Sequence, residues 1–313
     1  MNIAAAVDLG ATNLRCALIT EGSSLLCFQQ QEVHGIKDGS VITSLIADMI
    51  EEMSDAAGVQ PSSIGISAAG PVDVNRGSVV HSPNMSASEI SLTKPLSEKF
   101  GVPSFLLTDC KAAVYGEYLF GCGYGVSNLV YLTFSTGIGC GVLQDGKIFS
   151  GADGNAGEAG HFLVDTEYNI LCGCGGSGHW EAYSSGTGIP KFFAAWNKKY
   201  GLFSAEEEAM LNSAKDILSL AYTDERMKKF ASAVSLMNVR GMSSVICAYN
   251  PEKIILDGPL ARGYYSLLFS EAVSAAGSYL RAPEFEVSSL SGTAPLLGAG
   301  AYAMKRLEEG CGV

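Results

Sequence analysis

Ile3-Ala-Ala-Ala-Val-Asp-Leu-Gly-Ala-Thr12, near the start of the chain, predicts the architecture of the protein. Its apolar run leads into a glycine turn, and a partly alternating pattern resumes over residues 14–20, so we expect a strand, a turn and a second strand. The same unit recurs about 125 residues later, where Leu129-Val-Tyr-Leu-Thr-Phe134 leads into Ser135-Thr-Gly-Ile-Gly-Cys-Gly141 and a further strand. Two such units predict two similarly built domains that face one another.

Strands and helices alternate through the rest of the chain. Apolar residues recur at helical spacing over residues 40–57, and Gly58 ends that helix. The other predicted elements are strands at 63–67, 105–107 and 253–256 and helices at 110–120, 205–220, 225–249 and 295–307. This alternation is typical of an α/β domain.

Length and composition narrow the class of protein. The 313 residues suggest two domains, at roughly 150 residues each. Hydrophobic residues make up 47% and charged residues 17%, which excludes a disordered chain. The net charge of −12 argues against nucleic acid or an anionic membrane as the main partner. Apolar runs stop short of the roughly 20 residues of a spanning helix, and the N-terminus lacks the basic region of a signal peptide, so we expect a soluble, cytoplasmic protein.

The nine cysteines do not indicate a disulfide framework in a cytoplasmic chain of this size. Cys172 and Cys174 stand out because a single residue separates them. Six others are scattered singly and are predicted to be small core residues. They are Cys16, Cys27, Cys110, Cys122, Cys140 and Cys247.

Three glycine turns are candidate phosphate sites. They are Asp8-x-Gly10-x-Thr12, Thr136-Gly137-x-Gly139-x-Gly141 and Asp257-Gly258-Pro259. In the first, glycine lets backbone amides approach a phosphate while Asp and Thr offer oxygens to phosphate and Mg²⁺. The third could border a nucleotide base. Each could instead be a tight hairpin turn, but three together favour phosphate binding.

Asp109 lies between a predicted strand and a predicted helix. Most Asp residues at such a position are helix N-caps, and position alone favours that interpretation. The functional alternative is a general base at the mouth of an interdomain cleft.

Two histidines and the close cysteine pair fall in one Gly-rich region, which runs from Gly154-Asn-Ala-Gly-Glu-Ala-Gly-His161 to Cys172-Gly-Cys174-Gly-Gly-Ser-Gly-His179-Trp-Glu181. Thiolates and imidazoles are the usual ligands of tetrahedral zinc, and glycines allow the tight turns between them. The alternative is a Gly-rich surface loop with two idle thiols, because Cys-x-Cys is tighter than the usual zinc spacing. We favour a zinc site made by His161, Cys172, Cys174 and His179.

These motifs, in this order, resemble the ROK family (repressor, ORF, kinase), which are sugar kinases of the actin-like ATPase superfamily. The resemblance covers nearly the whole chain. Its most specific part is Gly154 to His161 together with Cys172-Gly-Cys174-Gly. Further matches are Asp8-Leu-Gly-Ala-Thr12 and Ser135-Thr-Gly-Ile-Gly139 with the phosphate motifs, Gly70-Pro-Val-Asp73 with the interdomain turn, and Ser82-Pro-Asn84 with the sugar loop.

The resemblance implies an α/β fold of two ribonuclease-H-like (actin-like ATPase) domains that flank an interdomain cleft. We expect residues 1–109 plus 293–313 to form the N-terminal domain. Residues 110–292 would form the C-terminal domain, which carries the sugar-binding and zinc loop. The last helix then crosses back to the N-terminal domain.

The resemblance also implies roles for single residues. Asp109 is the catalytic base, and His161 binds both zinc and the sugar. The sugar-binding residues are Asn84, Thr108, Asp109, Glu158, His161 and Glu181. ATP and Mg²⁺ are assigned to Asp8, Gly10, Thr12, Thr136, Gly137, Gly139 and Gly258.

The chain departs from the family pattern at three positions. His179 stands where many members have the last Cys of the zinc motif, and imidazole can replace thiolate there. Thr108 stands where Asn usually precedes the catalytic Asp, and Ala69 replaces the first Pro of the Pro-Gly-Pro turn.

The sequence therefore predicts an ATP-dependent kinase that phosphorylates the 6-hydroxyl of a neutral hexose or N-acetylhexosamine, with glucose or N-acetylmannosamine as first choices. No Lys or Arg is assigned to the sugar, which disfavours an acidic substrate. The alternative is a non-catalytic sugar or nucleotide sensor. Repressors of the family carry an added DNA-binding domain, and the first strand begins here at Ile3. We expect no nucleic acid or membrane partner, and a homodimer or homotetramer.

Overall fold

The computed structural model describes residues 2–22, 24–82, 85–275 and 280–310, which form two compact units. The first unit holds residues 1–127, 141–156 and 289–313, and the second holds residues 128–140 and 157–288. Residues 110–127 and 141–156 thus group with the N-terminal part, whereas the expected domain boundaries placed them in the C-terminal domain. The expected boundaries of the two domains, at residues 109/110 and 292/293, stay a prediction.

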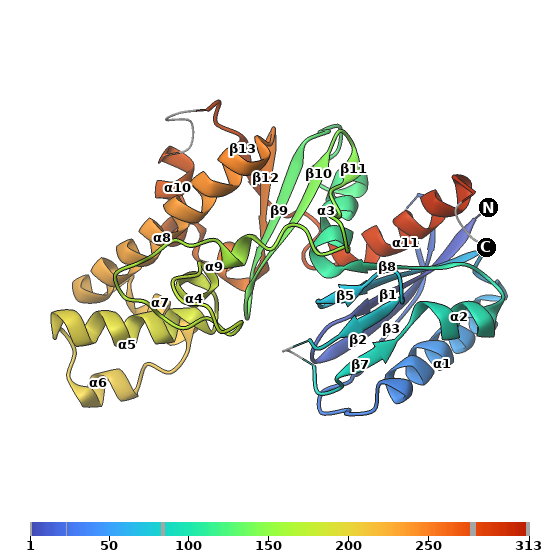
Figure 1. The fold of residues 1–313 in the computed structure, drawn as a ribbon, viewed down its shortest axis with the longest axis horizontal. Coiled ribbons are helices and arrows are strands. Elements are labelled where there is room, and N and C mark those ends of the chain that lie inside the picture. The colour runs from blue at the N-terminus through green and yellow to red at the C-terminus, as the bar shows by residue number, and fades with distance from the viewer. Residues whose placement is uncertain (1, 23, 83–84, 276–279, 311–313) are drawn as a thin grey trace. The chain divides into compact units, whose positions relative to one another are not determined.

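The helices and strands follow the labels of Figure 1. The first unit contains β1 (Ile3–Leu9), β2 (Asn13–Thr20), β3 (Leu25–Glu32), α1 (Gly39–Ala57), β4 (Ser63–Ala68), β5 (Val72–Asp73), β6 (Ser78–Val80), β7 (Glu89–Ser91), α2 (Thr93–Phe100), β8 (Ser104–Thr108), α3 (Asp109–Phe120), β11 (Lys147–Ile148) and α11 (Ala294–Glu308). The second contains β9 (Leu129–Phe134), a 3-10 turn (Ala159–His161), α4 (Glu181–Ser184), α5 (Gly188–Tyr200), α6 (Ala205–Ala209), α7 (Ala214–Leu220), α8 (Glu225–Tyr249), β12 (Lys253–Asp257), α9 (Gly258–Leu268), α10 (Ser270–Ala275) and β13 (Glu284–Val287). Strand β10 (Ile138–Gln144) runs from the second unit into the first.

The predicted strand-turn-strand repeat is confirmed. The first sheet has the order β3-β2-β1-β4-β8, in which β1 to β3 are antiparallel and β4 and β8 run parallel to β1. The second has the corresponding order β11-β10-β9-β12-β13, and β12 runs parallel to both β9 and β13. A small antiparallel sheet, β5-β6-β7, completes the first unit. The α/β class is therefore correct.

Strand β1 is buried on both faces, so its side chains divide between two cores. Val7 and Leu9 pack with the apolar face of α1, while Ala4 and Ala6 pack with Leu296 and its neighbours on α11. Alternate residues of a strand point to opposite faces, which explains this division. The small alanines leave room for α11.

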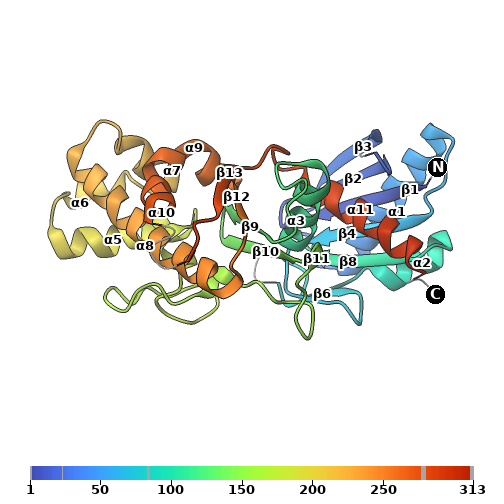
Figure 2. The ribbon, with the colours of Figure 1, turned by 90° about the horizontal axis from the view of Figure 1, so that it is seen from above.

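Helices α3 and α11 approach each other closely in the first unit (Figures 1 and 2). A Cβ added at Gly298 of α11 would lie 1.8 Å from the carbonyl oxygen of Ala112, and one at Gly116 of α3 would lie 2.4 Å from that of Ala294. Both glycines are therefore needed for the contact. This packing fixes the helix that begins at Asp109.

The core of the second unit is aromatic. The indole of Trp180 is fully buried, lies 5.4 Å from the Phe134 ring and donates a hydrogen bond to Asn238 Oδ1 at 2.9 Å. Gly241 of α8 makes room for this indole, since a Cβ there would lie 2.2 Å from the ring. Trp180 thus anchors the residue that follows it, Glu181.

Most of the predicted helices are confirmed, with one clear exception. Residues 205–220 form two short helices, α6 and α7, rather than one. Ser204 and Glu207 make a capping box at the start of α6, and Ser213 caps α7, so the chain restarts a helix after each serine. The core assignment is wrong for Cys247, which is exposed, while Cys27 and Cys122 are half-buried.

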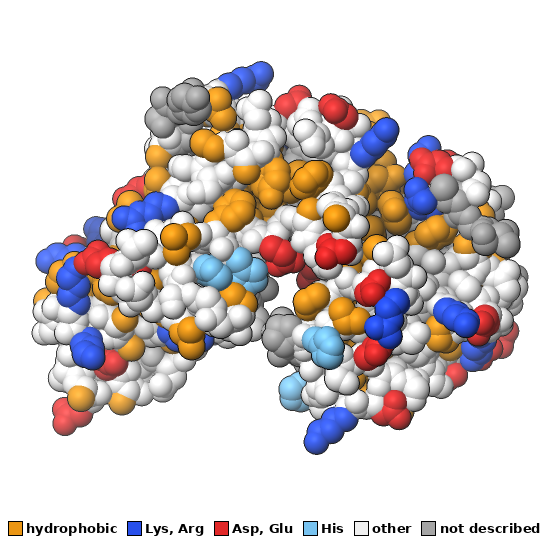
Figure 3. Space-filling view, in the orientation of Figure 1, with side chains coloured by type: hydrophobic (Ala, Val, Ile, Leu, Met, Phe, Trp, Pro, Cys, Tyr) orange, Lys and Arg blue, Asp and Glu red, His pale blue; other side chains and the backbone are white. Residues whose placement is uncertain are grey.

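Among the described residues, helix α8 is long and apolar enough to cross a membrane by length and composition. Of its most apolar window, 56% is buried inside the structure, as in a core helix. On the face drawn in Figure 3, acidic and basic side chains are interspersed among the described residues.

Candidate functional site

The first candidate phosphate turn begins at a buried carboxylate, Asp8, whose ion pair with Arg15 is partly exposed. Asp8 lies at the end of β1, where its Oδ1 accepts a hydrogen bond from Ser67 Oγ at 3.0 Å and its Oδ2 pairs with Arg15 Nη2. Burial raises the pKa of Asp8, against the lowering effects of Arg15 and Ser67. Gly10 closes the turn, its N–H donating to the Asn13 carbonyl at 2.9 Å, and Thr12 is exposed. The turn can therefore present oxygens and backbone amides to a ligand.

Arg15 also reaches across the first unit. Its Nη1 donates to the Gly292 carbonyl at 2.9 Å, in the segment that leads into α11. The guanidinium thus ties the Asp8 carboxylate to a second chain segment. We did not identify Arg15 or Ser67 from the sequence; the alternation of β2 gave no sign that Arg15 faces Asp8.

Asp109 is the first residue of α3, and Thr108 occupies the N-cap position. The Asp109 Oδ1 accepts the Cys110 N–H at 2.7 Å. Thr108 is buried and makes no side-chain cap hydrogen bond, and its methyl group lies toward Gly70. In the structure the N-cap residue of α3 is therefore Thr108 and not Asp109.

The second candidate phosphate turn, residues 135–139, lies against Glu181. The Oε2 of Glu181 accepts the Ile138 N–H at 3.0 Å, and a Cβ at Gly137 would collide with the same oxygen. Thr136 is exposed, and its carbonyl accepts the Thr187 hydroxyl at 2.9 Å. Glu181, which the resemblance assigned to the sugar, thus also supports the turn.

Gly258 lies at the same end of the second sheet. It has φ +91°, and a Cβ there would lie 2.3 Å from the Phe134 carbonyl oxygen, immediately before the second turn. Asp257 accepts hydrogen bonds from Tyr131 Oη at 2.7 Å and pairs with Arg262 at 2.9 Å. Two of the three candidate turns are therefore adjacent in the second unit.

The four predicted metal ligands come together. The ligand atoms of His161, Cys172, Cys174 and His179 all lie within 4.8 Å of one another. Cys172 Sγ is 3.7 Å from His161 Nδ1, and Cys174 Sγ is 3.2 Å from His179 Nδ1. Two sulfurs and two imidazole nitrogens at these separations fit a tetrahedral zinc ion, with its bonds of about 2.0–2.3 Å. Burial raises the pKa of Cys172 to about 11.

Glu158 and Glu181 border this cluster. Glu158 Oε2 is 3.8 Å from His161 Nε2, and its side chain is 61% exposed. The Cys172 Sγ approaches Glu181 Oε1 at 3.6 Å. One carboxylate oxygen of Glu181 therefore faces the thiol cluster while the other holds the second turn.

A buried carboxylate organises the loop that carries the cluster. Asp165 accepts hydrogen bonds from Tyr183 Oη at 2.7 Å and from the Tyr168 N–H at 2.8 Å. Burial opposes the charge of Asp165, but the Tyr183 hydroxyl and the backbone amides lower its pKa overall. Isolated bridges between Leu163 and His179 and between Leu171 and Ser177 close the loop. No motif or spacing in the sequence points to Asp165.

The predicted site residues divide between the two units. Asp8, Gly10, Thr12, Thr108 and Asp109 lie in the first unit. The second unit holds Thr136, Gly137, Gly139, Glu158, His161, Cys172, Cys174, His179, Glu181 and Gly258. Asn84 lies outside the described residues.

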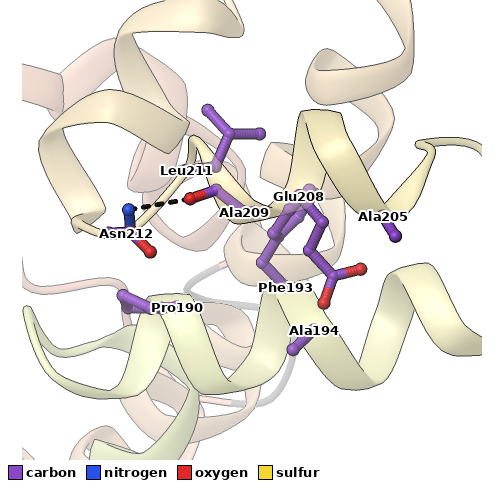
Figure 4. Close-up of a pocket in the computed structure, with 8 residues that line it drawn as sticks. All are labelled: Pro190, Phe193, Ala194, Ala205, Glu208, Ala209, Leu211 and Asn212. Atoms are coloured by element: carbon purple, nitrogen blue, oxygen red, sulfur yellow. Dashed lines mark hydrogen bonds between the residues drawn. The ribbon is translucent and has the colours of Figure 1, made fainter.

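A pocket of about 410 Å³ lies between α5 and α6, lined by Pro190, Phe193, Ala194, Ala205, Glu208, Ala209, Leu211 and Asn212 (Figure 4). Asn212 donates to the Ala209 carbonyl at 2.9 Å. None of these lining residues is a predicted site residue.

The chain is similar to known proteins over nearly its whole length. The chain is 32% identical to a glucokinase of Pyrobaculum calidifontis over 96% of this chain and 95% of the relative. The crystal structure of a ROK hexokinase from Thermus thermophilus matches with a TM-score of 0.82 and 26% identity, covering 98% of this chain and 99% of that one. A xylose repressor of Bacillus subtilis is 27% identical over 93% of this chain and 74% of its own length.

The glucokinase and the hexokinase support a sugar kinase of the actin-like ATPase fold. The sequence profile of the ROK family matches residues 4–306. The chain therefore belongs to the ROK family.

Proposed function

We propose that the protein is an ATP-dependent kinase that transfers the γ-phosphate to the 6-hydroxyl of a neutral hexose or N-acetylhexosamine, with glucose as the first candidate. The observation that carries the proposal is Asp109, a carboxylate at the junction of β8 and α3. The relatives named glucokinase and hexokinase support the substrate class. The cytoplasmic location and a homodimeric or homotetrameric state stay part of the proposal.

In this proposal Asp109 accepts the proton of the sugar hydroxyl as that oxygen attacks phosphorus. Thr108, Glu158, His161 and Glu181 hold the sugar hydroxyls. The three glycine turns, with Asp8 in the first, orient the nucleotide, and bound Mg²⁺ would supply charge neutralisation. His161, Cys172, Cys174 and His179 would hold a structural zinc ion.

An ADP-release assay on the full chain tests the activity. The panel contains glucose, mannose, glucosamine, N-acetylglucosamine and N-acetylmannosamine, each with ATP and Mg²⁺. We expect turnover with at least one neutral sugar. Asp109→Asn should abolish turnover while sugar affinity stays within about tenfold, or about 1.4 kcal/mol, because the amide keeps most hydrogen bonds but cannot take the proton.

If Asp109→Asn keeps a tenth of the wild-type kcat, the general-base assignment is wrong. Binding of a sugar without any turnover of the wild-type protein would instead favour the sensor, the alternative that the repressor relative brings. Calorimetric titration with each sugar distinguishes the two outcomes.

A further inference from the structure

Lys111 is a buried lysine two residues after Asp109. Its exposed fraction is 3%, and its Nζ donates hydrogen bonds to the carbonyl oxygens of Gly154 and Ala156, both at 2.8 Å. Those carbonyls belong to the Gly-rich segment that leads to Glu158. The lysine therefore joins α3 to this segment within the first unit.

Without such partners, a buried lysine at this position would destabilise the folded protein. A buried ammonium group loses its hydration and needs hydrogen-bond acceptors in return. Lys111 is the third residue of α3, where the positive end of the helix dipole disfavours a cation. The two carbonyls provide the compensation, so the lysine and the segment depend on each other.

A second side chain fixes the same segment. Asn155 brackets the backbone of Val72, its Oδ1 accepting the Val72 N–H at 3.3 Å and its Nδ2 donating to the Val72 carbonyl at 3.0 Å. The Ala156 N–H donates to the Ser150 carbonyl at 3.0 Å. Gly154 has φ +89° and lies against Val74, where a Cβ would collide. Residues 154–156 are thus held from both sides of Asn155.

Chain connectivity relates this anchor to the proposed reaction. Asp109 precedes Lys111 by two residues, and Glu158 follows Ala156 by two residues. Two residues span at most about 7 Å, so the placement of Ala156 limits that of the Glu158 backbone. The proposed proton acceptor, Asp109, is two residues from Lys111, and the proposed sugar ligand, Glu158, is two residues from Ala156, to which Lys111 donates a hydrogen bond.

We propose that Lys111 is a positioning residue that sets where the Glu158 loop starts relative to the helix of the catalytic base, and so determines sugar affinity. This inference rests on the proposed kinase function. In this proposal Lys111 acts through the backbone carbonyls of Gly154 and Ala156, to which its Nζ donates hydrogen bonds. Its loss should weaken sugar binding far more than ATP binding.

The test compares Lys111→Met, which keeps the length but removes the charge and donors, with Lys111→Gln, which keeps an uncharged donor. Lys94→Met on α2 is the matched control. Lys94 is exposed, and its ion pair with Glu98 is long, with 3.9 Å between Nζ and Oε1. We expect Lys111→Met to raise the sugar KM at least tenfold and leave the ATP KM within twofold. Lys111→Gln should recover part of the loss, and Lys94→Met should match wild type.

Hydrogen exchange supplies a readout that does not need activity. Peptides covering residues 150–158 should exchange faster in Lys111→Met than in wild type or Lys94→Met. A folded Lys111→Met protein with an unchanged sugar KM, or with equal losses for sugar and ATP, overturns the inference. If Lys111→Met does not fold, Lys111→Gln and Asn155→Ala carry the test, and an unchanged sugar KM in either overturns it.

Failure of the proposed kinase function would give a different result from failure of the inference about Lys111. A wild-type protein without turnover on the sugar panel contradicts the kinase, and hydrogen exchange then decides the inference alone. Unchanged exchange over residues 150–158 in Lys111→Met would show that the lysine does not hold the segment.

Discussion

Asp8 combines two properties that oppose each other. The residue is 5% exposed, which favours the protonated form, yet a phosphate and Mg²⁺ site needs the charged form. Burial raises the pKa of Asp8, and the Arg15 guanidinium acts in the opposite direction. Arg15 is in turn oriented by the Gly292 carbonyl. The charge of Asp8 therefore depends on a residue that the proposed reaction does not otherwise use.

Replacing Arg15 should shift the pH dependence of activity. Arg15→Met removes the guanidinium that opposes the effect of burial at Asp8 and leaves the Ser67 hydrogen bond, so the pKa rises further and the carboxylate takes up its proton at a higher pH. We expect the acid limb of the kcat/KM profile to move to higher pH, and the Mg²⁺ concentration for half-maximal activity to rise about tenfold.

Arg76→Met is the control, because Arg76 pairs with Glu89 on the surface and both side chains are largely exposed. Its profile should overlay that of the wild type. An Arg15→Met profile that also overlays the wild type, with the same Mg²⁺ requirement, would show that Arg15 does not support the charge of Asp8.

At the scale of single elements, local signals in the sequence predicted most of the structure. The spacing of apolar residues located α1, and Gly58 ends it in a left-handed conformation, as expected of a C-cap glycine. The break between α6 and α7 was missed, although Ser213, which caps α7, is a residue type that favours a helix start. What the sequence could not supply are contacts between distant segments. Lys111 with Ala156 and Asp165 with Tyr183 follow from tertiary packing alone.

The loop that carries the metal ligands yields a prediction about metal content. We expect about one zinc ion per chain, bound by two thiolates and two imidazoles in a closed site. Cys172→Ser should lose the metal and lower the melting temperature, because a structural metal stabilises the folded state. His179→Cys should keep the metal, since thiolate is an equally good ligand.

Cys247→Ser is the matched control, as Cys247 is an exposed cysteine outside the cluster. Elemental analysis gives the metal content, and thermal denaturation with and without a chelator gives the effect on stability. A wild-type protein without zinc, whose melting temperature and activity do not change with chelator, would contradict the metal site. His161 would then be a sugar ligand only.

Over the whole molecule, the predicted residues of the site come from both compact units. The repeat of the strand-turn-strand unit made this division predictable, because each copy contains a glycine turn between its two strands. The sequence did not reveal that Glu181 touches both the second turn and Cys172. Ile138 and Cys172, which this one carboxylate links, are 34 residues apart in the chain. The link is a property of the fold, whereas each motif can be read separately.

The net charge of −12 leads to a prediction about partners, because the family includes both kinases and a xylose repressor. Binding to duplex DNA depends on clustered Lys and Arg that displace counterions from phosphates. On the face drawn in Figure 3, basic side chains of the described residues are interspersed with acidic ones.

Fluorescence anisotropy with a labelled duplex of about 30 base pairs at about 150 mM salt should therefore show no saturable binding up to about 10 µM protein. A sequence-specific DNA-binding protein serves as the positive control, and a nucleotide analogue checks that the protein is folded and competent. Saturable DNA binding that weakens as salt rises would contradict the prediction and favour a repressor over a kinase.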